Sequence, residues 1–492
     1  DPACPLWRQP EAVQVDQQIL MRYAIPFLLI AAACISCDPL ANPVSGRLSF
    51  SSDTISFDTV FSGYGSATLE LRVKNLEDDP LLIDRIWLGG GSGSPFRINI
   101  DGQPATEAQN VTLARDDSLF IFVIVTIDPT GADLPLAVTD SVNFISGSHS
   151  GRVILEAWGQ DVRLVDEDIL TPAVWTEGKP YVIRDHLLVD TLATLTLEPG
   201  TRVYMHHGAM VTVAGSLVAA GTAEKRITIA TDRLEKEYRD VPGRWKGLRF
   251  QSCSHGNILN HTDIRNAEIA VRIDGLPSSV PDLSMNSTTL MHNTVASLAA
   301  KHADLFAVNS LFAHSGFSTV SLAEGGSYEF IHCTISNSWE YSFRSEPALL
   351  IRQGTGVMAT VSVINSVVSG SLGDELMIQA PVSAVAAAFR ADSSLIKVDT
   401  LAADWYSTAL FTRVITTRPP LFIDENAWDF RPDTLSPLLD RAGKTEMKLW
   451  PADIRNKPRP AFDGPDIGAF ERQGGEKRKE EETGMAGMRV RH

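Results

Sequence analysis

Apolar and polar residues alternate in short runs along this chain, and that period of two predicts β-strands rather than helices. The run "SATLELRVKN" (66–75) places Leu69, Leu71 and Val73 on one face. Gly-, Asn- and Asp-rich turns separate it from further runs at 81–88, 96–100, 119–127 and 152–158. About seven short strands within residues 46–161 predict a β-sandwich.

From residue 165 onward the pattern becomes a repeat. Its template is a small residue, any residue, an apolar residue, any residue, then Asn, His or Gly, and finally Asn, Ser or Ala. Strand units repeated at such spacing bury their apolar faces only against one another, so residues 165–472 are predicted to form a solenoid. The segments that fit the template, starting 26, 22, 23 and 33 residues apart, are 262–267, 288–293, 310–315, 333–338 and 366–371.

Several motifs resemble known families and extend the all-β prediction. "SFDTVFSGYGSATLELRVKN" and "SPFRINIDG" resemble the Hydin-type Ig-like domains that precede β-helices in Gram-negative surface lipoproteins. This implies an Ig-like sandwich over 46–161, followed by a right-handed parallel β-helix over 165–472. Motifs resembling pectin-lyase-like β-helical surface proteins are "LEPGTRVYMHHGAMVTVAGSLVAAGTAEKRITIATD" (197–232), "GRWKGLRF" (243–250), "LFIDENAWDFRPDTLSPLLDRAG" (421–443) and "PDIGAFE" (465–471).

The most apolar run, "MRYAIPFLLIAAACISC" (21–37), is shorter than the roughly 20 residues that a bilayer span needs. Arg22, an apolar middle and small residues at the end are typical of a secretory signal. Residues 1–20 lack a starting Met, so we interpret them as an upstream extension and Met21 as the start.

The end of this run, "CISCDP", resembles the lipobox of bacterial lipoproteins. The resemblance implies that Cys37 becomes an acylated N-terminal residue, tethered to the domains by residues 38–45 and held in a membrane by its lipid. Ordinary signal-peptidase cleavage nearby is the alternative. The expected location is the cell envelope, at the outer membrane or cell surface of a Gram-negative bacterium.

Net charge and cysteine content limit the classes of partner and of fold that are expected. A net charge of -17 argues against nucleic acid as a partner, and it disfavours polyanionic glycans unless a cation bridges them. Few cysteines would remain after signal cleavage, so an exported disulfide scaffold is not expected. We expect a monomer without a cofactor, and we expect the charged tail 473–492 to be disordered.

Catalytic motifs are not evident in the predicted solenoid. Glycosidases of this fold need paired carboxylates, yet residues 165–472 contain no Asp-Asp pair, and Asp263, Asp274 and Asp304 are scattered. No catalytic residue and no metal site is therefore predicted.

Four polar residues recur at the fifth template position. Asn266, His292, His314 and Asn337 are predicted to form a ladder in which stacked side chains satisfy backbone groups of the turns. A metal shared by the two histidines is the alternative.

The stretch "SNSWEYSFRSEP" (336–347) follows one template strand and is predicted to be a loop. Trp339, Tyr341 and Arg344 are candidate glycan-binding residues, because aromatic faces can stack on sugar rings beside charged hydrogen-bonding groups. The alternative is that an aromatic side chain caps the local core.

Together these observations favour a non-catalytic, lipid-anchored envelope protein that binds polysaccharide or another envelope component. One alternative is a polysaccharide lyase or glycoside hydrolase of the pectin-lyase-like fold. Another is a structural rod without a specific ligand, because fold alone does not define function.

Overall fold

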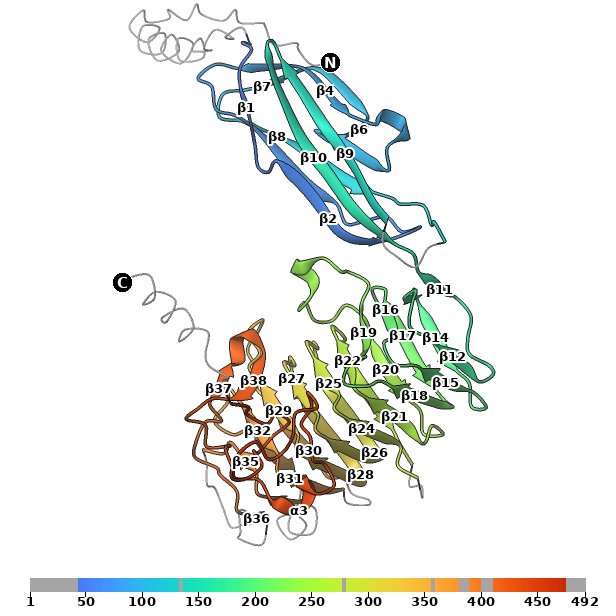
Figure 1. Ribbon diagram of the computed structural model, residues 1–492, viewed down its shortest axis with the longest axis vertical. Coiled ribbons are helices and arrows are strands. Elements are labelled where there is room, and N and C mark those ends of the chain that lie inside the picture. The colour runs from blue at the N-terminus through green and yellow to red at the C-terminus, as the bar shows by residue number, and fades with distance from the viewer. Residues whose placement is uncertain are drawn as a thin grey trace, which may run out of the picture. The chain divides into compact units, whose positions relative to one another are not determined.

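The computed structural model describes residues 43–131, 136–276, 280–354, 359–379, 389–399 and 410–474. Residues 1–20, the predicted signal segment 21–37 with Cys37, most of the predicted tether 38–45 and most of the tail 473–492 lie outside these ranges. Nearly all regular structure in the described residues is β-strand, which confirms the all-β prediction (Figure 1). Within these ranges, no helix has the length and apolar character needed to cross a bilayer.

The chain divides into two compact units. Of the described residues, the first unit contains those up to Phe57 together with 65–126 and 138–157, and the second contains those within 58–64 and 127–137 and those from Trp158 onward.

Two five-stranded sheets make up the first part of the chain, in the orders β1-β3-β8-β5-β6 and β2-β10-β9-β4-β7. Neighbours in the first sheet run antiparallel, and β4 is antiparallel to both of its partners. The strands are β1 (Leu48–Phe50), β2 (Thr54–Phe61), β3 (Leu69–Asn75), β4 (Leu81–Leu88), β5 (Phe96–Ile100), β6 (Gln103–Ala105), β7 (Glu107–Leu113), β8 (Ser118–Val125), β9 (Leu136–Ser146) and β10 (His149–Gln160).

The predicted alternation is visible on β3. Leu71 and Val73 are fully buried, whereas Glu70 and Arg72 beside them are exposed. Burying each such apolar side chain contributes about 1.5–3 kcal/mol, so the period of two in the sequence is enough to orient the strand.

Two large sheets build the second unit, and each strand of the ten-stranded sheet is followed along the chain by one or two strands of the sixteen-stranded sheet. Every pair with a defined register in the ten-stranded sheet is parallel. Its strands are β11 (Arg163–Val165), β13 (Tyr181–Ile183), β16 (Arg202–Met205), β19 (Ile227–Thr231), β22 (Thr262–Arg265), β25 (Thr289–Met291), β27 (Leu311–Ala313), β29 (Thr334–Asn337), β32 (Val367–Gly370) and β35 (Leu395–Ile396).

The sixteen-stranded sheet is also paired in parallel, and its long strands β26 and β28 each join two branches of the sheet. Its strands are β12 (Ala173–Trp175), β14 (His186–Val189), β15 (Thr194–Leu197), β17 (Met210–Val213), β18 (Ser216–Ala220), β20 (Gly247–Phe250), β21 (Asn257–Asn260), β23 (Ile269–Asp274), β24 (Leu283–Asn286), β26 (Ala296–Val308), β28 (Val320–Ile331), β30 (Leu349–Arg352), β31 (Thr360–Ile364), β33 (Leu376–Gln379), β34 (Phe389–Asp392) and β36 (Phe411–Thr412).

The sequence template coincides with the register of the ten-stranded sheet. Asp263 lies opposite Thr289, Thr289 opposite Leu311, Leu311 opposite Thr334, and Thr334 opposite Val367. These offsets are the spacings of the template, so equivalent positions stack from one repeat to the next.

Small residues occupy the buried first template position. There the serine hydroxyls accept hydrogen bonds from backbone N–H groups of the preceding repeat. Ser366 Oγ accepts a 2.9 Å hydrogen bond from the Cys333 N–H, and Ser310 Oγ accepts a 3.2 Å bond from the Thr288 N–H. Burial also raises the pKa of the Cys333 thiol to about 12, so this cysteine is a packing residue.

The segment after residue 420 packs against the ten-stranded sheet. It contains β37 (Phe422–Asp424), β38 (Asp429–Pro432) and the short helix α3 (Lys444–Met447) (Figure 1). The apolar cluster that joins this segment to the sheet includes Met291, Leu311, Ala313, Val367, Leu395, Phe422, Phe430, Leu438, Ile454, Ile467 and Ala469.

Candidate functional site

An aromatic cluster gathers where strands β25, β27 and β29 of the second unit end. We use this name for His292, His314, Trp339, Tyr341 and Trp428. The ring centroid of His314 lies 4.9 Å from that of Trp339, 5.7 Å from Tyr341 and 4.3 Å from Trp428. His314 is only 1% exposed, whereas Tyr341 is 54% exposed, so the cluster has a buried base and an accessible rim.

A shared backbone bend explains why these histidines meet. Asn266, His292 and His314 have φ of 68°, 58° and 54°, in the left-handed region that Asn and His enter more readily than most residues. Each lies just after a strand of the ten-stranded sheet, so the chain turns at the same place in three successive repeats.

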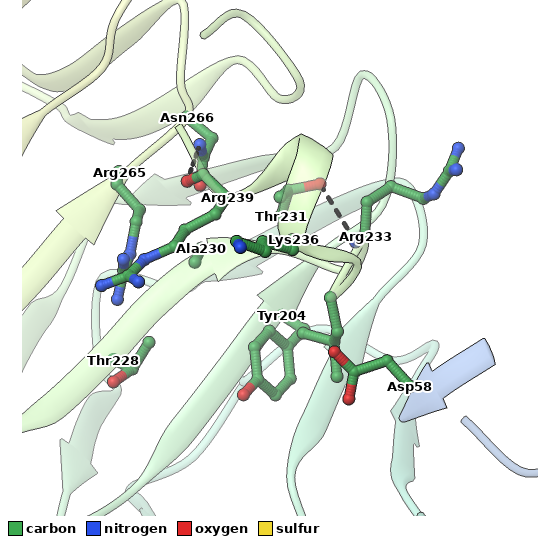
Figure 2. Close-up of a pocket in the computed structure, with 11 residues that line it drawn as sticks. Asp58, Tyr204, Thr228, Ala230, Thr231, Arg233, Lys236, Arg239, Arg265 and Asn266 are labelled. Carbon is green, nitrogen blue, oxygen red and sulfur yellow. Dashed lines mark hydrogen bonds between the residues drawn. The ribbon is translucent and has the colours of Figure 1, made fainter. Parts of the chain in front are cut away.

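The four residues predicted as a ladder make different contacts. His292 Nδ1 and His314 Nδ1 are 2.8 Å apart. Asn266 donates instead to the carbonyl of Arg239 (Figure 2) and to that of Val241, and the Asn337 amide bonds to the Ser315 backbone. Both asparagines thus satisfy backbone groups, while only the two histidines contact each other.

The histidine pair stays neutral in the folded chain above about pH 3. Burial, together with the charges of Arg265 and Arg239, lowers the pKa of His292 to about 3, and burial also lowers that of His314 to about 3. His292 Nε2 lies 3.4 Å from Asp240 Oδ1. A proton on His292 Nε2 and one on His314 Nδ1 would satisfy both contacts, because each neutral imidazole has one donor and one acceptor.

Of the predicted glycan-binding residues, Trp339 and Tyr341 belong to the aromatic cluster, with ring centroids 5.0 Å apart. Arg344 does not share their accessible surface. Its side chain is 2% exposed and forms an ion pair with Glu375, which is 0% exposed. Cys37, the predicted lipidation site, lies outside the described residues.

The scattered aspartates do not converge. Asp263 pairs with Arg226 at 2.7 Å, and Asp274 pairs with Arg249 at 3.1 Å on the other large sheet. Within the described ranges, no group of three or more His, Cys, Asp or Glu side chains is placed to hold a metal ion.

Sequence reasoning missed Trp428. Its ring lies against both histidines, with centroid distances of 4.9 Å to His292 and 4.3 Å to His314. The residue follows the 3₁₀ turn Glu425–Ala427 in the C-terminal segment. In the sequence, Trp428 is visible only as an aromatic residue inside the "DENAWDF" motif. The motif does not indicate which strands this segment packs against.

Carboxylates border the aromatic cluster. Glu425 Oε1 accepts hydrogen bonds from the Ser336 hydroxyl at 2.9 Å and the Ser338 hydroxyl at 3.1 Å, so this carboxylate is fixed in place. Burial raises the pKa of Tyr341, and the charges of Glu340 and Asp240 add to this rise. The accessible rim therefore offers ring faces together with hydrogen-bond acceptors.

A cavity of about 450 Å³ in the second unit has a predominantly basic lining (Figure 2). We call it the basic cavity. Sequence reasoning missed it, because its loop "RLEKEYRD" (233–240) mixes both charges and reads as a solvated segment. Its lining residues are Asp58, Tyr204, Thr228, Ala230, Thr231, Arg233, Leu234, Lys236, Arg239, Arg265 and Asn266.

Comparison with known proteins gives no family. No protein-family model and no curated protein matches the sequence. Among solved structures, a family 123 glycoside hydrolase from Clostridium perfringens matches 27% of this chain and 30% of its own, with 9% identity and a TM-score of 0.19. The catalytic domain of a GH87 alpha-1,3-glucanase in complex with tetrasaccharides matches 71% of this chain and 90% of its own, with 8% identity and a TM-score of 0.14. Scores this low leave the function to be argued from the side chains.

Proposed function

We propose that this chain is a lipid-anchored envelope protein that binds polysaccharide at the aromatic cluster. The observation that carries the proposal is the gathering of Trp339, Tyr341 and Trp428 around the buried His314, with Tyr341 more than half exposed. Flat aromatic faces suit the apolar face of a sugar ring, and the phenol and indole edges suit its hydroxyl groups.

The rings of the aromatic cluster pack against one another, and these contacts hold each ring in position for binding. Trp339 Nε1 also donates a 3.0 Å hydrogen bond to Ser342 Oγ. Side chains that are already ordered lose little freedom when a ligand arrives, and this lowers the entropic cost of binding.

The finer fold belongs to the same proposal. In-register parallel strands, through which the chain returns to the same two sheets in every repeat, support a right-handed parallel β-helix as the second unit. Two five-stranded sheets with antiparallel neighbours support an Ig-like sandwich as the first. On this basis the sandwich is a spacer, and the β-helix presents the binding surface.

Replacing Trp339 or Tyr341 with alanine should weaken polysaccharide binding about tenfold or more, because each ring supplies a large share of the stacking area. Isothermal titration calorimetry against a panel of soluble polysaccharides measures the effect. Phe343→Ala is the matched control, since Phe343 is 91% exposed on the same loop and is not part of the cluster. Binding that Phe343→Ala reduces as much as Trp339→Ala, or no binding to any polysaccharide, would favour the structural rod.

Catalysis is tested on the same panel. Release of reducing ends or unsaturated products by the purified protein, lost in Asp240→Asn or Glu340→Gln, would establish the lyase or hydrolase alternative. Stable binding without products supports the non-catalytic proposal.

The lipid anchor makes a separate prediction. Metabolic labelling with a fatty-acid probe should mark the wild type, and Cys37→Ser should abolish the mark because the acylated residue is removed. Cys34→Ser serves as the control and should keep the label. Equal labelling of the wild type and both variants would show that Cys37 is not the lipidated residue.

A further inference from the structure

The basic cavity collects positive charge in a chain whose net charge is -17. Arg233 has a carboxylate partner, because its Nε lies 3.1 Å from Glu235, and its guanidinium lies 3.9 Å from the centre of the Tyr238 ring. Across the described part of the chain, no carboxylate lies within ion-pair distance of Lys236, Arg239 or Arg265. Asp58 is the one acidic residue in the lining, so the cavity keeps a net positive charge.

The backbones that carry the two unpaired arginines are held in place. The Arg239 carbonyl accepts a 3.0 Å hydrogen bond from the amide of Asn266, which is fully buried (Figure 2). The Arg265 carbonyl accepts a 2.8 Å bond from the indole N–H of Trp245, which is 1% exposed. Both side chains therefore extend from backbone positions that buried hydrogen bonds hold in place.

The positive charges of the basic cavity also affect a neighbouring histidine. Arg265 and Arg239 help to lower the pKa of His292, so their fields reach the base of the aromatic cluster. Like charges close together repel one another, and an anion bound between them would offset that repulsion.

The basic cavity and the aromatic cluster lie on neighbouring strands of one sheet. Arg265 ends β22, and β25, β27 and β29 follow in order, each paired with the next. Three strand spacings of about 4.8 Å separate Arg265 from the loop that carries Trp339, or about 14 Å in all. One extended polymer can therefore contact both features.

We propose that the basic cavity binds a carboxylate or sulfate group on the same polysaccharide that stacks on the aromatic cluster, so that the ligand is an acidic glycan. This inference rests on the proposed function. It also modifies the expectation from net charge, because the cations needed to hold a polyanion are supplied locally by the protein.

The experiment compares a neutral polysaccharide, a polyuronate and a sulfated polysaccharide of similar length, each titrated against wild type, Arg239→Gln/Arg265→Gln and Trp339→Ala. Arg418→Gln is the matched control, since Arg418 is exposed and lies outside the cavity lining. Circular dichroism verifies that each variant is folded. The double arginine variant should lose about tenfold or more in affinity for one or both acidic glycans and keep its affinity for the neutral one.

Salt gives a second readout. Raising sodium chloride should weaken binding of the acidic glycan to the wild type and should do so less in the double arginine variant, since ionic screening acts on the removed charges. The preference between polyuronate and sulfated glycan identifies the anionic group.

The outcomes separate the two proposals. Equal binding of neutral and acidic glycans by the wild type, or unchanged acidic binding in the double arginine variant, would overturn the acidic-ligand inference and leave the aromatic site standing. Acidic binding that depends on the arginines but not on Trp339 would support the cavity and overturn the aromatic site. An equal loss in Arg418→Gln would show a general charge effect and overturn the cavity.

Discussion

Arg344→Ala is expected to lower the free energy of unfolding by about 3–5 kcal/mol, because it leaves a carboxylate buried without its partner. Arg344 Nη2 lies 2.5 Å from Glu375 Oε1, and Nη1 lies 2.9 Å from Oε2, so the pair is bidentate. The Glu375 carboxylate also accepts backbone hydrogen bonds from Ala348 and Leu372, each at 2.7 Å. Chemical denaturation followed by tryptophan fluorescence measures the loss.

Two further variants make this prediction specific. Arg344→Met combined with Glu375→Leu should lose less stability than Arg344→Ala alone, because no buried charge then remains. Arg352→Ala is the control, since its side chain is 41% exposed and its Nη2 lies 3.6 Å from Glu346 Oε2, and exposed pairs of this kind contribute about 0–1 kcal/mol. Equal losses in Arg344→Ala and Arg352→Ala would contradict a structural role for the buried pair.

The same ion pair affects the candidate site indirectly. Arg344 Nη2 also donates to the Asn337 carbonyl at 2.9 Å, and this ties the end of the loop that carries Trp339 and Tyr341 back to its beginning. Arg344→Ala should therefore weaken glycan binding only together with stability. Trp339→Ala should weaken binding with much less effect on stability, and this distinguishes a positioning residue from a contact.

Local patterns were sufficient to predict the repeats. The small first residue and the apolar third residue of the template indicate which side chains are buried within one repeat. The spacing of the segments predicts the strand register without long-range information. Alternation on β3 likewise predicted which side chains of the first unit are buried. These features depend on the period of the strand, and the sequence displays that period directly.

Features built from distant segments could not be predicted in the same way. Glu425 bonds to Ser336 across 89 residues, and Trp428 reaches the histidines through the same return of the chain. Arg344 looked like a sugar contact because sequence alone does not show that Glu375 lies opposite it. The basic cavity was hidden because Arg239 stands among acidic neighbours in the sequence, and only folding separates their charges.

Acidification should destabilise the protein through the histidine pair. His292 and His314 have folded pKa values of about 3, whereas an unfolded histidine titrates near 6.5. Below pH 6.5 the unfolded chain therefore binds protons that the folded chain does not, and the free energy of unfolding falls until pH approaches 3. The contribution is full above pH 6.5, and each histidine loses about 1.4 kcal/mol per pH unit as the pH falls below that value.

Between pH 6.5 and 4.5 the two histidines together should cost about 5 kcal/mol. His292→Asn/His314→Asn isolates this contribution, because asparagine tolerates the left-handed bend and already occupies the equivalent position at Asn266. Denaturation at several pH values should show a smaller loss on acidification in this variant than in the wild type. His207→Asn removes an exposed histidine of the second unit and should leave the wild-type slope unchanged.

Glycan binding should respond to the same protonation. Protonation of both histidines turns the 2.8 Å Nδ1–Nδ1 contact into a repulsion between two donors, and this contact lies beneath the rings of Trp339 and Trp428. Affinity for the polysaccharide should therefore fall as the pH approaches 3, under conditions where circular dichroism still reports a folded chain. If affinity stays constant until the protein unfolds, the histidine pair supports the fold alone and does not position the aromatic rings.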